Sequence, residues 1–477
     1  MITTLLAASL MLSCNPKEIL EPTDSNIMII DGDTVKVRND KAQGNFGVNK
    51  SRWNFRILYG DTILKYSPLN ISFSTKKVNI EKIKNNVDPD LKGKPFRMIV
   101  VGDGVAAGVR DGGYFNEGLE TSFPNLVAKQ MGIDFKQPKF EPSDFNGFGR
   151  AIYTNKNYTG GPVPKFVEVS NNTGYTKKDD MGNFELKPYI GGRVDNFASI
   201  GSLNYDVEID TKMHPGLSRL KGNQKISPID LYLKEKFDFI IICDNVGMLR
   251  NNQPSFSHDI NFPNGFEGYK NIITRSSGQP QYSSRLNFLL KIKERKEVRG
   301  VMFTAPNFMK LPYFNWVTVD EVKNILNLYG KSNLFDIYSI KKILPTPKID
   351  SLVGKNVNMN LKPFISENKK IDIFNASQND EFNVLSSIGN SNSETRNVAK
   401  SLNFALVDLF SVYEAVFAGK YLTHDGIIAN VENFFSKDGM SPSAFGQVII
   451  ANETIKTINA HYGLDIELLP TRPFLLK

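Results

Sequence analysis

One short stretch constrains the fold more than any other, because an apolar run ends there abruptly in glycines. Phe96–Val101 predicts a buried strand, and Gly-Asp-Gly follows directly at residues 102–104. A continuous apolar run of this length is typical of a strand that is covered on both faces of a parallel sheet. Ligands of α/β proteins bind at the carboxyl ends of such strands. The stretch therefore predicts an α/β body with a site just beyond Val101.

The rest of the body repeats this pattern of apolar strands separated by helices. Further strands are expected at Phe237–Ile242, Gly300–Ala305 and Phe404–Leu409. Strands that alternate with helices indicate a parallel sheet with helices on both faces, so we expect a three-layer α/β domain over residues 95–477. Expected helices lie at 122–131, at 285–299, at 318–332 and from Pro442 to Gly463 with Ser441 as N-cap. Residues 134–230 and 345–400 lack periodicity and are expected to be large loop insertions.

The N-terminus resembles a bacterial lipoprotein signal. Ile2–Ser13 is apolar and about 12 residues long, which is too short to cross a bilayer but fits a secretion signal. Residues 10–14 are Leu-Met-Leu-Ser-Cys and resemble a lipobox, in which a small residue precedes the lipidated Cys. We expect a signal peptide over residues 1–13, acylation of Cys14, for example with palmitate, and a tether over residues 14–26. The plain alternative is a poorly ordered N-terminus with an incidental Cys.

Between this tether and the body, residues 27–94 have a different pattern. Short alternating segments are separated by Asp-Gly, Gly-Asp and Pro signals, which favours a small antiparallel β-rich segment. Residues 85–94 contain Pro89 and Gly93 and are expected to link this segment to the body. Nothing in residues 27–94 indicates catalysis.

The composition permits a large folded body and excludes some classes of function. The 477 residues are 40% hydrophobic and 23% charged, which supports a sizeable core and argues against global disorder. The net charge is +8, but the densest basic run, at residues 291–299, includes Glu294 and Glu297. Mixed signs at helical spacing are typical of a solvated helix face, so we expect no nucleic-acid partner.

The sequence also gives no reason to expect a cofactor or a metal. Two cysteines are too few for a disulfide scaffold or a Cys-based zinc site, and Cys243 ends an apolar run as a buried thiol would. Gly102, Gly104 and Gly108 form a loose dinucleotide-binding pattern. That pattern works only where a helix begins at the glycines, whereas the residues after Gly108 have a loop composition.

Several blocks resemble the SGNH (GDSL-like) hydrolases, in particular their lipoprotein branch in Bacteroidota. Val101–Gly104 is similar to the first block, in which a Ser after Gly-Asp is the nucleophile. Residues 196–201 are similar to the second block, where the N–H of a glycine, here Gly201, helps to form the oxyanion hole. The resemblance spans about residues 96–463 and implies a three-layer fold and a Ser-His-Asp triad. Further similar segments are Gly108, Tyr114, Glu120–Pro124, residues 135–138, Ala305-Pro306, residues 311–314, residues 438–442, Gly446 and residues 449–453.

The sequence departs from the family pattern at the residues that perform catalysis in that family. Gly104 stands at the nucleophile and Ser441 at the general-base His. The oxyanion-hole Asn corresponds to Val246, or to Asn245 if the third block is shifted by one residue. Of the triad, only Asp438 is retained. Acyl transfer needs a nucleophile beside a base, so the resemblance predicts a site without catalytic residues.

The four histidines and two serines near the second block are the candidates to replace the missing nucleophile and base. His461 lies near the end of the last helix, where a cation interacts favourably with the helix dipole. His424 lies in an expected turn before the last block and has the best chance of approaching the site. Ser199 and Ser202 have hydroxyls near the second block but no base beside them. His214 and His258 lie in the insertions.

The sequence therefore predicts a non-enzymatic protein of SGNH-like fold. We expect a lipid-anchored binding or accessory subunit of a bacterial outer-membrane complex, either periplasmic or exposed at the cell surface. One alternative is an active or rewired esterase that acts on lipids or acylated glycans. Another is a lipid or glycan carrier that uses the former catalytic site.

Overall fold

The structure is a computed structural model, and it describes most of the body and parts of the remaining chain. Residues 1–26 with Cys14, the expected helix at 318–332, and Gly201, Ser202, His214, Asn245, Val246 and His258 lie outside the described residues. Expectations about them stay predictions. The described residues are 27–30, 33–38, 57–60, 71–153, 166–168, 173–178, 184–199, 205–206, 208–209, 215–244, 280–295, 297–315, 342–343, 373–374 and 378–475.

A parallel sheet of four strands forms the centre of the body, as the apolar runs predict. Its strands are β4 (Met98–Gly102), β9 (Phe239–Cys243), β10 (Arg299–Phe303) and β13 (Ala405–Val407), in the order β13-β10-β9-β4. All neighbouring pairs are parallel. Each strand lies within one or two residues of its expected bounds. The α/β fold class is therefore confirmed.

An extended segment at residues 195–199 lies beside β4 and continues the sheet. The Val100 N–H donates to Asp195 O at 2.8 Å, and the Phe197 N–H donates to Val100 O at 2.8 Å. Counted along the chain, the spatial order becomes 2-1-3-4-5, a doubly wound order whose switch point lies between β4 and β9. Gly102 and Cys243 are register partners at that point.

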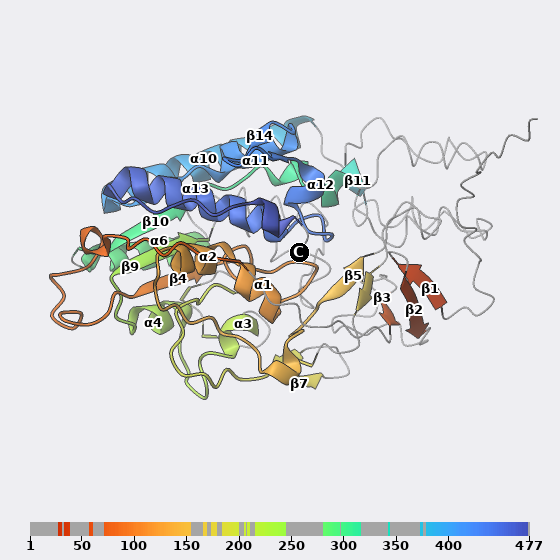
Figure 1. Cartoon of the computed structure of the whole chain (residues 1–477), viewed down its shortest axis with the longest axis horizontal. Helices are drawn as coiled ribbons and strands as arrows, with labels where there is room; N and C mark the ends of the chain where they lie inside the picture. The colour runs from red at the N-terminus through yellow and green to blue at the C-terminus, as the bar shows by residue number, and fades with distance from the viewer. Residues whose placement is uncertain are drawn as a thin grey trace, which may run out of the picture.

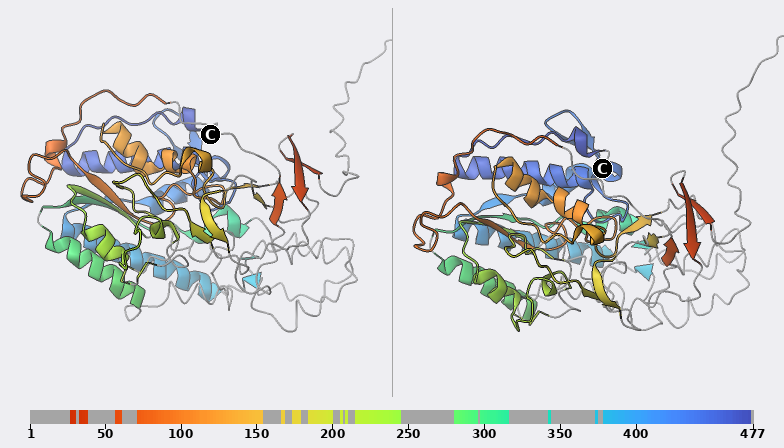
Figure 2. Two further views of the ribbon diagram at one scale, coloured as in Figure 1. Left: turned by 90° about the horizontal axis from the view of Figure 1, so that it is seen from below. Right: turned by 60° about the horizontal axis from the view of Figure 1, so that its bottom comes forward.

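Helices cover both faces of this sheet (Figure 2). On one face lie α2 (Phe123–Gln130) and α13 (Ala444–Tyr462), and on the other lie α4 (Pro228–Leu233), α6 (Pro280–Glu294) and α10 (Gln378–Leu402). Successive strand residues point to opposite faces, so Val100 belongs to the first core, while Ile99 and Val101 belong to the second. The three layers follow directly from strands that are apolar on both faces.

The last helix begins two residues later than predicted. Its N-cap is Ser443, whose Oγ accepts from the Gly446 N–H at 3.1 Å, and its C-cap is Gly463 with φ +66°. The prediction that Ser441 caps the helix with Pro442 at its first position is wrong. Ser441 Oγ donates instead to Asp438, and Pro442 pairs with Phe435 in an isolated bridge.

The expected polar loop at residues 345–400 is also wrong in its second half, because α10 occupies Gln378–Leu402. Its many Asn and Ser residues obscured the helical pattern. One of them has a clear structural role: Asn392 Oδ1 accepts from the Ala305 N–H at 2.7 Å, and its Nδ2 donates to Ala305 O at 2.9 Å. The amide thus satisfies the backbone just beyond β10.

The N-terminal strands and the first insertion share one sheet of five strands. Its order is β1 (Ile27–Ile30), β2 (Asp33–Arg38), β3 (Ile57–Gly60), β6 (Phe166–Glu168) and β5 (Ala151–Tyr153). Pairing is antiparallel except between β3 and β6. Figure 1 shows this sheet to one side of the three layers. The sheet of the N-terminal segment therefore also includes β5 and β6, which come after β4 and α2 of the body in the chain.

Shorter elements complete the described structure. They are α1 (Asn116–Thr121), β7 (Tyr175–Lys178), β8 (Phe184–Leu186), α3 (Pro215–Ser218), β11 (Lys342–Ile343), β12 (Ile373–Phe374), α11 (Leu409–Phe417), β14 (Tyr421–Leu422), β15 (Ile428–Ala429) and α12 (Val431–Phe434). None of the helices in the described part of the chain has the length and apolarity needed to cross a bilayer.

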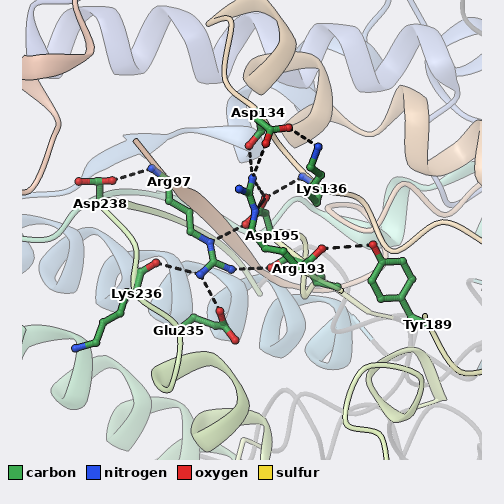
Figure 3. Close-up of polar contacts among 10 residues, drawn as sticks. Arg97, Asp134, Lys136, Tyr189, Arg193, Asp195, Glu235, Lys236 and Asp238 are labelled. Atoms are coloured by element: carbon green, nitrogen blue, oxygen red, sulfur yellow. Dashed lines mark hydrogen bonds and ion pairs between the residues drawn. The ribbon is translucent and has the colours of Figure 1, made fainter. Parts of the chain in front are cut away.

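The amino end of the sheet is held by a network of ion pairs (Figure 3). Arg97, just before β4, donates from Nε to Asp195 Oδ1 and from Nη1 to Glu235 Oε2, both at 2.8 Å. Asp238 accepts from the backbone N–H groups of Arg97 and Asn85 at 2.7 and 3.0 Å. Residues 85–94, expected as a linker, are therefore bonded to the body at Asn85. This network fixes the edge segment against β4.

Candidate functional site

The loop after β4 contains Gly104, which the resemblance aligns with a nucleophile, and it is tightly folded. Asp103 Oδ1 accepts from the Val105 N–H at 2.9 Å, and Gly104 O accepts from the Val109 N–H at 2.8 Å. Residues 103–109 are all buried. Gly102 has φ +146°, and a Cβ there would lie 2.1 Å from Cys243 O. Only glycine allows this close approach of the two strand ends.

Two buried amides hold this loop from the neighbouring elements. Gln447 of α13 donates from Nε2 to Val105 O at 3.0 Å and accepts at Oε1 from the Phe123 N–H at 2.9 Å. Asn196 of the edge segment donates from Nδ2 to Ala106 O at 3.1 Å. The sequence analysis did not identify either amide as a positioning residue. The available signal for Gln447 was a polar residue within the apolar stripe of the last helix.

The retained acid of the resemblance is held by donors from its own loop and from the loop after β4. Asp438 Oδ1 accepts from the backbone N–H groups of Met440 and Ser441 at 2.9 and 2.7 Å. Its Oδ2 accepts from Ser441 Oγ at 2.5 Å and from the Gly112 N–H at 3.3 Å. Both side chains are buried. The carboxylate thus binds a hydroxyl where the family pattern places an imidazole.

A turn at residues 110–113 connects the Gly104 loop to this acid. The Asp111 N–H donates to Ser436 Oγ at 3.1 Å, next to the bond between Gly112 and Asp438. Asp111 has φ +45°, an uncommon value for a residue with a side chain. Burial raises the pKa of Asp111, and the charge of Asp438 adds to this, against the opposing effect of Arg110. The structure therefore joins the Gly104 loop and the Asp438–Ser441 pair at one end of the sheet.

The polar groups at the ends of the other strands have partners within the chain. Beyond β9, Asp244 accepts from Arg285 Nε at 2.7 Å and from Tyr205 Oη at 3.0 Å. Beyond β10, Thr304 Oγ1 donates to Asp408 Oδ1 at 2.9 Å. Burial raises the pKa of the Cys243 thiol well above its usual value. Cys243 is a buried free thiol, as its sequence context predicts.

His461 and Ser199, two of the described replacement candidates, have contacts with other parts of the chain. His424 lies in the exposed turn between β14 and β15, and the ring Nε2 of His461 lies 3.1 Å from Asn403 O near the end of α13. The Ser199 N–H donates to Gly102 O at 3.0 Å. Within the described ranges, no group of three His, Cys, Asp or Glu side chains is placed to hold a metal ion. Gly201, Asn245 and Val246 lie outside the described residues.

Comparisons with protein family models, with curated proteins and with solved structures gave no match. The resemblance to SGNH hydrolases therefore depends on the sequence blocks alone.

Proposed function

We propose that the chain is a degenerate SGNH-like lipoprotein that binds rather than hydrolyses. In this proposal it is an accessory subunit of a bacterial outer-membrane complex, and acylated Cys14 anchors it. The fold and the chemistry of a site are separable, so a scaffold can be kept for assembly after its reactive groups are lost. Its binding surface would include the loops at the carboxyl end of the sheet.

The observation that carries the proposal is the contact between Ser441 and Asp438. In a Ser-His-Asp triad the acid orients the imidazole and stabilises its charged form. Here the acid accepts from a Ser hydroxyl at 2.5 Å, and a hydroxyl does not take up a proton near neutral pH. Asp438 therefore acts as a structural acceptor that ties residues 438–441 to Gly112.

The nucleophile position supports the same conclusion. Gly104 has no side chain, and the loop around it is buried and held by Gln447 and Asn196. Loss of any one member of a triad leaves only about 10³–10⁴-fold catalysis over water. Here both the nucleophile and the base are missing from the matching positions.

Ester hydrolysis by the purified protein tests this proposal. We expect no turnover of a panel of short-chain p-nitrophenyl esters above a heat-denatured control. Turnover that is abolished by Ser199→Ala or His424→Ala would overturn the proposal and favour the rewired esterase.

Reconstruction of the triad tests the alignment behind the proposal. Gly104 is not among the residues with positive φ, so its backbone tolerates a serine. Gly104→Ser with Ser441→His is expected to give weak esterase activity, with Gly104→Ser alone as the matched inactive control. Equal activity of the single and double variants would contradict the assignment of Ser441 to the base position.

Membrane association and assembly need their own test. Cys14→Ser is expected to move the protein from the outer-membrane fraction to the soluble fraction and to abolish incorporation of labelled palmitate. Extraction of the native chain in mild detergent is expected to recover it in a larger complex. A chain that always elutes alone would count against the subunit role and favour a free carrier.

A further inference from the structure

Arg110 is a buried arginine whose guanidinium is only partly bonded. It is 6% exposed and lies between the turn at residues 110–113 and helix α1. Its Nη1 lies 3.2 Å from Thr121 Oγ1, and its Nη2 lies 4.0 Å from Glu117 Oε2, which is beyond hydrogen-bond distance. Its Nε has no hydrogen-bond partner. Nε is therefore unpaired, and Nη2 on the same edge has only the long contact with Glu117.

Three other arginines of the described chain, Arg285, Arg219 and Arg97, have this edge occupied. Arg285 grips Asp244 through Nε and Nη2 at 2.7 and 3.2 Å. Arg219 donates from the same two nitrogens to the carbonyls of Lys187 and Lys139 at 2.9 and 3.3 Å. Arg97 uses them for Asp195 and Val194, at 2.8 and 2.9 Å (Figure 3). Arg110 differs from these three arginines because its Nε has no hydrogen-bond partner.

The nearby carboxylates already accept hydrogen bonds from other donors. Glu117 Oε2 accepts from Arg150 Nη2 at 2.6 Å, and Glu120 Oε1 accepts from Lys139 Nζ at 2.5 Å. Asp438 accepts from Ser441 and Gly112. The Asp111 carboxylate has a favourable charge interaction with Arg110, and it accepts a hydrogen bond from the Lys437 backbone N–H. Burial lowers the pKa of the Arg110 guanidinium, which shows the cost of leaving this charge without full hydrogen bonding.

The backbone beside Arg110 is strained as well. Asp111 has φ +45°, and the turn is held closed by bonds from Asp111 to Ser436 and from Gly112 to Asp438. Backbone strain and an unsatisfied buried donor each reduce stability, and such costs persist mainly at binding sites and switch regions. Their coincidence within two residues points to a ligand rather than to packing.

We propose that the Nε/Nη2 edge of Arg110 is a binding site for a small anionic group with two coplanar oxygens, a carboxylate or a phosphate, which enters when the turn at residues 110–113 opens. The parallel N–H bonds of this edge match such a group bidentately. The ligand would accept from Nε and Nη2 of Arg110 in the way that Asp244 accepts from Nε and Nη2 of Arg285. This inference goes beyond the proposed function and does not depend on the loss of hydrolysis.

Anion titration of the purified full chain tests the site. Sodium formate, sodium phosphate and sodium chloride are compared at equal ionic strength. Saturating formate or phosphate is expected to raise the Tm by roughly 2 °C over chloride and to shift one arginine Nε–H resonance of protein labelled with ¹⁵N-arginine. A response to formate alone identifies a carboxylate ligand, and a response to phosphate alone identifies a phosphate ligand. If neither anion shifts an arginine Nε–H resonance, the proposal is overturned.

Two matched variants locate the response. Arg110→Lys keeps the charge but removes the bidentate edge, and it is expected to abolish both the Tm rise and the resonance shift. Arg193 is a half-exposed arginine at the amino end of the sheet, and Arg193→Lys is expected to keep both the Tm rise and the resonance shift. A full response in Arg110→Lys would show that the anion binds elsewhere and would overturn the proposal. If Arg110→Lys does not fold, the titration of the unmodified protein still decides.

Discussion

The two ends of the central sheet satisfy their buried charges in different ways. At the amino end, Arg97 and Asp195 are bonded on every side by charged or backbone groups (Figure 3). At the carboxyl end, Arg110 leaves Nε without a partner and Asp111 has an uncommon φ. The acid at that end, Asp438, accepts hydrogen bonds from a hydroxyl and from backbone N–H groups.

This difference assigns separate roles to the two ends. A fully bonded buried ion-pair network fixes the register of the edge segment against β4 and serves stability. Unsatisfied and strained groups reduce stability and are kept where a protein binds or switches. The contrast therefore favours the carboxyl end over the amino end as the place of the proposed binding surface.

The largest loss of stability is expected from a substitution at the amino end of the sheet. Asp195 is fully buried and accepts from Arg97, Arg193 and the Lys136 N–H. Asp195→Ala leaves two guanidinium groups without this acceptor and is expected to lower the free energy of unfolding by about 3 kcal/mol, measured by urea denaturation. Asp134→Ala, on an exposed carboxylate of the same network, is the control and is expected to cost less than about 1 kcal/mol. Equal losses of stability in the two variants would show that the buried Asp195 contributes no more than an exposed ion pair.

A smaller effect is expected at the carboxyl end. Asp438→Ala removes the acceptor of Ser441 Oγ, of the Gly112 N–H and of two further backbone N–H groups, and is expected to cost about 2 kcal/mol. Ser441→Ala removes a single bond and is expected to cost about 1 kcal/mol in the same urea denaturation experiment. The reverse order would mean that Ser441, and not the acid, organises the loop.

The smallest effect concerns Asp425, which lies away from both ends. Burial alone would raise its pKa, but hydrogen bonds from Thr471, Thr423 and the Arg472 N–H together lower it. A carboxyl whose pKa is lowered by folding stabilises the protein above its unfolded pKa of about 3.9, and this contribution is lost as the pH falls through the folded value. The stability difference between the native chain and Asp425→Asn, followed by thermal unfolding, is therefore expected to shrink between pH 6 and pH 3. A constant difference would show that the carboxylate is not selectively stabilised.

Local signals were sufficient for much of the fold. Each apolar run became a strand of the parallel sheet, and Gly463 ends the last helix as predicted. The helix α10 was missed because its inner face contains Asn392 and Thr395, which are buried among partners that the sequence does not reveal. The N-cap at Ser443 was missed because Ser441 has equal local propensity, and only the contact with Asp438 separates the two.

The site was predictable only in part, for a related reason. The sequence analysis named Gly104, Asp438 and Ser441 through the family blocks, and the structure joins their loops at one end of the sheet. It did not name Gln447 or Arg110. Their roles depend on which donors and acceptors surround them after folding, and a single sequence does not specify that.

By itself, the sequence determined the α/β class and the parallel strands, because these depend on residue type and periodicity along the chain. Only the tertiary structure decided that Ser441 donates to the carboxylate of Asp438 and that Nε of Arg110 has no hydrogen-bond partner. Hydrogen bonding between distant segments depends on distance and angle in space. Residue order alone does not fix either quantity.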